Sequence, residues 1–85
     1  MALTLYTKPA CVQCNATKRE LKKHGLTAGV DYDVVDVTED SNALEKIKAM
    51  GFLAAPVVIT ETESWAGFQP DKIRDFIASA RVAVA

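Results

Sequence analysis

The sequence predicts one α/β domain over residues 1–85, in which strands and helices follow the order β-α-β-α-β-β-α. Three observations support this: short runs of β-branched residues alternate with segments of helical periodicity, no long stretch is left unassigned, and 85 residues provide one core. A helix between two strands predicts a right-handed crossover and a parallel pair, whereas a short connection between strands predicts an antiparallel hairpin. We therefore expect a four-stranded mixed sheet flanked by three helices, with helices on both faces.

The first half of the chain is expected to form two strands and two helices. Apolar and hydroxyl side chains alternate over residues 2–7 before Pro9, which predicts the first strand. Residues 12–24 contain no Gly or Pro and end in cations followed by Gly25, a typical helix C-terminus. A β-branched run at 32–37 predicts the second strand, and capping residues at 38–41 begin a second helix that stops at Gly51.

The second half is expected to form a hairpin and a last helix. Pro56 opens a strand over residues 56–60, a position where its missing N–H does least harm. Polar residues 61–64 predict a turn, and residues 65–67 are long enough for a short edge strand only. Pro70 suits the first position of a helix, and the apolar residues that follow it keep helical spacing: Ile73, Phe76, Ile77 and Ala80.

Composition excludes several classes of protein. A chain with 49% hydrophobic and 25% charged residues is expected to fold as a soluble domain rather than stay disordered. The longest uncharged run covers the twelve residues 49–60, too few to span a bilayer, and the first residues have no basic region typical of a signal peptide. A net charge of −1 does not favour nucleic acid. We expect a cytoplasmic protein that binds neither nucleic acid nor membrane.

The charges are unevenly distributed along the chain. Five cations and one acid give a formal charge of +4 through His24, which leaves −5 for the remainder. Six acids and no Lys or Arg lie between Asp31 and Glu45. The simplest interpretation is a solvated surface. The alternative is electrostatic steering of an acidic partner toward the positively charged end.

The two cysteines, Cys11 and Cys14, are poorly placed to stabilise the fold. A disulfide that closes so short a loop removes only about 2 kcal/mol of unfolded-state entropy, against nearly 5 for a loop of about 100 residues. Two cysteines and one histidine also cannot fill a four-ligand zinc site within one chain. In a reducing cytosol, a close cysteine pair favours catalysis over a structural role.

The spacing of the pair at the start of a helix suits thiol-disulfide exchange. Residues three apart on a helix have Cβ atoms about 5–6 Å apart, close enough to reach disulfide geometry. The positive helix end favours a thiolate at Cys11, and Lys8 adds to this effect. We expect an exposed Cys11 to attack the disulfide of a substrate. We expect Cys14, buried on the inward stripe with Thr17 and Leu21, to cleave the resulting mixed disulfide. The alternative is two core cysteines that meet by chance.

Three motifs resemble those of a known family. Residues 5–14, LYTKPACVQC, resemble the first strand and active-site loop of glutaredoxins, and residues 55–58, APVV, resemble the loop that faces the cysteines in the thioredoxin fold. The Cys-Val-Gln-Cys motif together with residues 65–70, WAGFQP, is similar to the NrdH-redoxins, which are glutaredoxin-like proteins. The resemblance extends over nearly the whole chain and implies the thioredoxin/glutaredoxin fold.

The resemblance also implies an activity and a set of site residues. NrdH-redoxins are electron carriers, reduced by thioredoxin reductase with electrons from NADPH, that reduce class Ib ribonucleotide reductase. Cys11 and Cys14 are then the catalytic pair, no cofactor or metal is implied, and we expect a monomer. Pro56 becomes the cis-proline whose loop presents the Ala55 backbone to an extended substrate, although a trans proline that begins a strand stays open. The residues implied in contacts with the partner are Lys8, Val12, Gln13, Ala55, Pro56, Trp65 and Phe68.

Other functions remain open at this point. The closest alternative is a glutathione-dependent glutaredoxin, but these proteins usually have Gly-Gly, a small residue and an acid where this chain has residues 66–71, AGFQPD. We therefore expect weak glutathione binding. A dimer that shares four thiolates around zinc or an iron-sulfur cluster is a third possibility. A structural interaction domain is the fourth. Trp65 and Phe68 also have an alternative interpretation as core aromatics.

Overall fold

The structure is a computed structural model that describes the backbone of residues 2–84 and the side chains of residues 2–79. It contains the predicted elements in the predicted order, with bounds that coincide with the expected ones or differ from them by a few residues. The side chain of Ala80, expected on the apolar face of the last helix, lies outside the described residues. The elements are β1 (Leu3–Thr7), α1 (Val12–Lys23), β2 (Asp33–Asp36), α2 (Ser41–Ala49), β3 (Val57–Thr60), β4 (Ser64–Ala66) and α3 (Pro70–Val84).

The strands form one mixed sheet in the order β2-β1-β3-β4. Strand β1 runs parallel to β2 and antiparallel to β3, which pairs antiparallel with β4. The parallel pair and the hairpin are the two arrangements that the connections predict, so the fold class is confirmed. Strand β1 is central, and its C-terminal end leads directly into the segment that contains Cys11.

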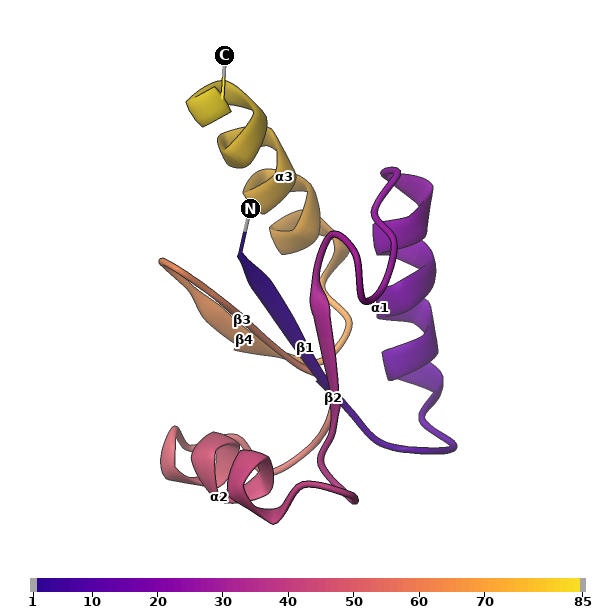
Figure 1. Ribbon diagram of the computed structural model, residues 1–85, viewed down its shortest axis with the longest axis vertical. Helices are drawn as coiled ribbons and strands as arrows, with labels where there is room; N and C mark the ends of the chain where they lie inside the picture. The colour runs from indigo at the N-terminus through magenta and orange to yellow at the C-terminus, as the bar shows by residue number, and fades with distance from the viewer. Residues whose placement is uncertain (1, 85) are drawn as a thin grey trace.

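Each face of the sheet has its own hydrophobic core. Helices α1 and α3 lie on one side of the sheet and α2 lies on the other (Figure 1). Neighbouring strand residues point to opposite faces. Leu5 and Val58 belong to the core beneath α1 and α3, whereas Tyr6 and Val57 belong to the core against α2. The alternation of side chains along the strands therefore supports helices on both faces.

The ends of helix α1 follow the local chemistry of the chain. Cys11 is the N-cap residue, with an extended backbone, and Lys22 and Lys23 occupy the last turn. His24 caps the C-terminus, and its Nε2 lies 3.0 Å from Glu20 Oε2. Cys14, Thr17 and Leu21 are the buried residues of the helix, which confirms the predicted inward stripe.

The last edge strand ends one residue earlier than the sequence predicts. Gly67 adopts a φ of 82°, a left-handed conformation that ends the extended strand. Its N–H still donates to the Pro56 carbonyl, at 2.8 Å, so the start of the following loop stays attached to the segment before β3. Over residues 2–84, no helix is long and apolar enough to cross a membrane.

Candidate active site

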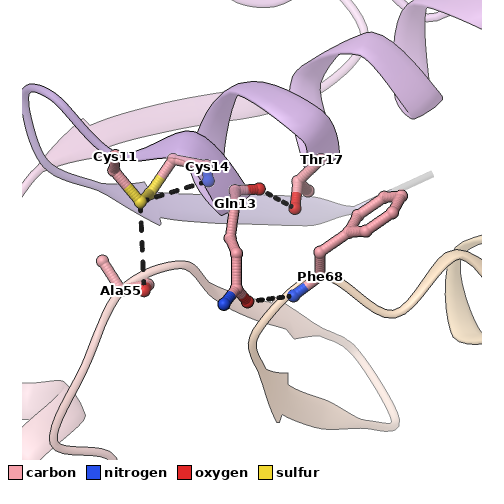
Figure 2. The surroundings of a disulfide bond; sticks show 6 residues. All are labelled: Cys11, Gln13, Cys14, Thr17, Ala55 and Phe68. Carbon is pink, nitrogen blue, oxygen red and sulfur yellow. Dashed lines mark hydrogen bonds between the residues drawn. A yellow bond between two sulfur atoms is a disulfide. The ribbon is translucent and has the colours of Figure 1, made fainter.

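The cysteine pair lies where three segments meet. Strand β1 ends at Thr7, a short loop reverses the chain, and α1 begins after Cys11. Within this loop Ala10 has a φ of 55°, an uncommon conformation for a residue with a Cβ atom. Segments 52–56 and 66–69, which flank the hairpin, contribute Ala55 and Phe68 to the surroundings of the pair (Figure 2).

Cys11 and Cys14 form a disulfide, with their Cα atoms 5.2 Å apart. The backbone N–H of Cys14 donates to the Cys11 Sγ at 3.1 Å, so the sulfur occupies the place of an N-cap acceptor. This is the predicted juxtaposition of sulfur and unpaired helix N–H groups. Negative charge on the sulfur is favoured there, because the N–H bond and the positive helix end both stabilise an anion.

Cys11 is more buried than the sequence predicts. Its exposed fraction is 7%, whereas that of Cys14 is 0%. The Cys11 Sγ lies 4.0 Å from the carbonyl oxygen of Ala55, so segment 52–56 covers it from the side opposite α1 (Figure 2). The expectation of an exposed Cys11 is therefore wrong for the disulfide form, yet Cys11 remains the more accessible residue of the pair.

The Ala55–Pro56 peptide bond is cis, as the family resemblance implies. The Pro56 side chain is fully buried, and the backbone carbonyl of Ala55 approaches the disulfide. In the reduced form, the Cys11 thiol can donate a weak hydrogen bond to the Ala55 carbonyl that approaches it. The segment thus offers backbone groups, rather than a proline ring, to a partner protein.

Gln13, the second residue between the cysteines, binds a distant loop. Its Oε1 accepts a hydrogen bond from the Phe68 N–H at 3.0 Å, and its backbone carbonyl accepts one from Thr17 Oγ1 at 2.9 Å. A Cβ atom on Gly67 would lie 3.3 Å from the same Oε1. Because glycine has no Cβ atom, the Gln13 side chain can approach the backbone closely here. Nothing in the spacing of the motif predicts this contact, because it joins residues 55 positions apart.

Asp36, at the end of β2, lies beside the C-terminal end of β1. It pairs with Thr7 across the sheet, and its Oδ1 accepts hydrogen bonds from the Thr38 hydroxyl and N–H, at 2.6 and 2.8 Å. These two bonds, with a smaller contribution from the Lys18 charge, hold the pKa of Asp36 below its ordinary value. A carboxylate therefore stays ionised near this end of the sheet.

Comparisons with known proteins agree on one family. A family model described as glutaredoxin matches residues 3–65. The glutaredoxin-like protein NrdH of Escherichia coli K12 is 42% identical over 73 residues, which cover 86% of this chain and 85% of that protein. The chain belongs to the NrdH-redoxins of the glutaredoxin family. NrdH of Lactococcus lactis strain IL1403 is 32% identical over 71 residues, 84% of this chain and 93% of that protein.

A solved structure supports the same assignment. The NrdH-redoxin of Escherichia coli, described as having a thioredoxin-like activity profile, matches with a TM-score of 0.81 and 41% identity. The match covers 88% of this chain and 93% of that structure. As an NrdH-redoxin, the chain is a dithiol redox carrier whose redox-active group is the Cys11–Cys14 pair.

The two aromatic residues of the NrdH-like motif have different positions. Trp65 is only 3% exposed and belongs to the core beneath α1 and α3, and Phe68 packs against the same core while partly exposed. The Trp65 indole N–H is buried and has no hydrogen-bond partner among the described residues. Both aromatics are therefore core residues, and only Phe68 also reaches the surface.

Two apolar residues close in sequence to Cys11 and Ala55 have exposed side chains. Val12, beside Cys11, is 80% exposed, and Leu53 is 91% exposed. Lys8 is exposed in the loop that precedes the helix. The sequence singled out Val12 and Lys8 but missed Leu53, since a leucine in an apolar run gives no signal that its side chain faces outward. Among residues 2–84, no group of three His, Cys, Asp or Glu side chains is arranged to hold a metal ion.

Proposed function

We propose that this redoxin accepts two electrons from thioredoxin reductase, which takes them from NADPH, and passes them to the oxidised cysteine pair of a class Ib ribonucleotide reductase. The observation that supports this most directly is a disulfide at a helix N-terminus with the Ala55 backbone against its more exposed sulfur. The thioredoxin-like activity profile of the similar Escherichia coli protein favours thioredoxin reductase as the electron donor. Both partners need a compartment that keeps thiols reduced, so the cytoplasm is the proposed place of action.

The reaction consists of two exchanges at sulfur. In the reduced protein, the Cys11 thiolate attacks one sulfur of the partner's disulfide, forms a mixed disulfide and releases the other sulfur as a thiolate. Cys14 then loses its proton and attacks the Cys11 sulfur, which releases the partner's second thiolate and forms the Cys11–Cys14 disulfide. The partner gains two electrons and this protein loses two. Thioredoxin reductase restores the dithiol by the same exchange in reverse.

The positions of the two sulfurs favour this division of roles. Cys11 is the more accessible residue of the pair, and its sulfur already accepts a hydrogen bond from the Cys14 N–H, so its thiolate is stabilised as it attacks or leaves. Cys14 is fully buried on α1 and reaches only its neighbour, so its attack is intramolecular and fast. A partner in extended conformation would pair with the backbone at Ala55. Lys8, Val12, Gln13 and Phe68 are proposed to border that partner, while Pro56 and Trp65 support the site from within.

Two features disfavour glutathione as the electron donor. The Phe68 N–H, a donor near the start of α3, is already occupied by Gln13. The first acid beyond this loop, Asp71, forms an ion pair with Arg74. A free amino group on a small thiol therefore finds no unpaired carboxylate at this position.

A coupled assay tests the proposal. We expect NADPH and thioredoxin reductase to support reduction of insulin and of a class Ib ribonucleotide reductase, with far slower turnover when glutathione and glutathione reductase replace them. Cys11→Ser should abolish turnover, because no thiolate remains to attack. Cys14→Ser should also stop turnover but should accumulate a mixed disulfide at Cys11, which mass spectrometry detects. Full activity of Cys11→Ser would contradict the mechanism, and a preference for glutathione would favour an ordinary glutaredoxin.

A further inference from the structure

The outward face of helix α1 begins beside the disulfide. The buried side chains of this helix are Cys14, Thr17 and Leu21, which define its inner side. Residues three or four positions apart lie on the same side of a helix, so most exposed residues of α1 form one stripe on the opposite side. This outward stripe consists of Val12, Asn15, Arg19, Lys22 and Lys23. Its first residue is the neighbour of Cys11, so the stripe connects the redox site with the far end of the helix.

The positive charge of the outward stripe is not neutralised by the protein itself. Arg19, Lys22 and Lys23 are exposed, and none of them forms an ion pair with a side chain of residues 2–79. The acid of this helix, Glu20, is engaged with His24. Two cations of α3, by contrast, have acidic partners within the chain. The stripe therefore has three charges available for an external anion.

The cations lie within or at the rim of the area that a protein partner covers. The helix rises about 1.5 Å per residue, which places Arg19 about 12 Å and Lys23 about 18 Å from Cys11 along the helix axis. An interface of standard size covers about 800 Å² on each partner, equivalent to a disc of about 16 Å radius. A partner centred on the Cys11 sulfur therefore covers Val12 and reaches Arg19, while Lys23 lies at the rim.

The chemistry of the stripe fits an acidic protein surface better than a membrane or a nucleic acid. The apolar side of α1 is buried in the core, so this helix cannot insert into a lipid surface. The stripe has no aromatic residue on which bases could stack, and the formal charge of −5 on residues 25–85 disfavours a long polyanion. A protein that exchanges with Cys11 already covers Val12, so its own surface lies opposite the cations.

We propose that the outward stripe of α1 docks an acidic patch on the protein that this redoxin reduces, about 12–18 Å from the reactive disulfide of that protein. The inference rests on the proposed function and specifies the surface that the electron acceptor presents. Charges at the rim of an interface act mainly on the rate of association, and salt weakens their effect. The stripe therefore speeds up the encounter and orients the acceptor, while the exchange at Cys11 does not depend on its cations.

Disulfide peptides that differ only in charge test this inference without any reductase. Two cyclic disulfide peptides each have a linker of six Gly and Ser residues, which spans about 13 Å on average, followed by four Glu in one peptide and four Gln in the other. Each peptide oxidises the reduced protein in a single turnover, which thiol alkylation and mass spectrometry follow. Each rate is divided by the rate of the same peptide with dithiothreitol, so that differences in intrinsic reactivity cancel.

The expected result is a preference that salt removes. The Glu peptide should react about fivefold faster than the Gln peptide at low ionic strength, since each exposed ion pair contributes little by itself. The ratio should fall below about twofold at about 1 M salt, where the Debye length is about 3 Å.

Two arginines on different helices provide a matched pair of variants. Arg19→Glu reverses a charge in the outward stripe, and Arg74→Glu makes the same change of net charge at an exposed position of α3. We expect Arg19→Glu to reduce the preference for the Glu peptide to less than about twofold at low ionic strength, whereas Arg74→Glu should leave it unchanged. Both variants should react with the Gln peptide at the rate of the unmodified protein, because neither residue takes part in the exchange.

The outcomes separate this inference from the proposed function. Equal rates for the two peptides, both of them reduced, would overturn the docking stripe and leave the redox carrier intact. An equal effect of Arg19→Glu and Arg74→Glu would also overturn the stripe, because net charge alone would then explain the preference. Oligothymidylate that competes with the Glu peptide more strongly than free tetraglutamate of equal charge would assign the stripe to nucleic acid and overturn the proposal. A protein that reduces neither peptide would overturn the proposed function and the stripe together.

Discussion

The two segments that flank the disulfide differ in how they are held. Segment 66–69 is fixed by internal bonds: the Gly67 N–H donates to the Pro56 carbonyl, the Phe68 N–H donates to Gln13, and the Gln69 side chain donates to the Ala66 carbonyl. Segment 52–55 instead exposes Leu53 and borders an open groove. One side of the redox site is therefore satisfied from within the chain, and the other side has apolar surface left for a partner.

This difference indicates the direction from which a partner approaches. Polar groups that already have partners gain little from a new ligand, whereas exposed apolar surface gains from being covered. We therefore expect the side of α2 to contribute binding free energy and the side of α3 to act as a rigid boundary. Changes at three residues, Trp65, Gln13 and Thr38, test this contrast, in order of decreasing effect.

Removal of Trp65 should have the largest effect on stability, because segment 66–69 follows Trp65 and rests on the core to which Trp65 belongs. Trp65→Ala should lower the free energy of unfolding by about 3–5 kcal/mol. Leu53→Ala, in segment 52–55, should change it by less than about 0.5 kcal/mol. Urea unfolding followed by circular dichroism measures both. Equal losses would contradict the contrast between the two sides.

A second Trp65 variant separates packing from polarity. Trp65→Phe keeps an aromatic ring and removes the buried indole N–H, which has no partner among the described residues. Leaving such a group unpaired costs about 1–3 kcal/mol, so this variant should lose much less stability than Trp65→Ala. A loss as large as that of alanine would show that the N–H finds a partner in solution.

Removal of the Gln13 acceptor should have an intermediate effect. Gln13→Met keeps the length of the side chain but leaves the Phe68 N–H without its acceptor, so the amide should exchange about two- to tenfold faster with solvent. Hydrogen exchange followed by NMR measures this at single residues. Asn15→Met, an exposed position on the same helix, serves as the control and should leave Phe68 unchanged.

The smallest effect is expected at Asp36, the last residue of β2. Thr38→Val removes the hydroxyl donor while the backbone N–H remains, so the pKa of Asp36 should rise toward its ordinary value. A lowered pKa in the folded state contributes stability above the ordinary carboxyl pKa, and this contribution is lost as the pH falls through the lowered value. NMR titration of the Asp36 carboxyl carbon checks the shift, and an unchanged pKa would contradict its assigned cause.

Features that depend on near neighbours in the sequence were predictable. The alternation of apolar residues, the glycine after α1 and Pro70 at the start of α3 act within a few residues, so they indicate the elements and their order. The placement of Cys11 at a helix start also follows from local signals, and it is observed as the N-cap.

Features that depend on distant segments were not predictable from local patterns in the sequence. Cys11 is covered by Ala55, which lies 44 positions away, so its low exposure has no local signal. The bond between Gln13 and Phe68 and the outward position of Leu53 arise in the same way, because loops far apart in the chain meet only after the sheet forms. The motif indicates the chemistry of the site, while tertiary packing decides its accessible surface.

The central position of β1 has a consequence for the order in which this site is assembled. The two cysteines are three positions apart, so their disulfide can close as soon as the first part of the chain is available. The Ala55 contact instead requires that β3 pair with β1, a contact between segments separated by more than half the chain, and such distant pairing is slow. An oxidised cysteine pair can therefore exist before the chain has folded, whereas recognition of a partner has to wait for the sheet.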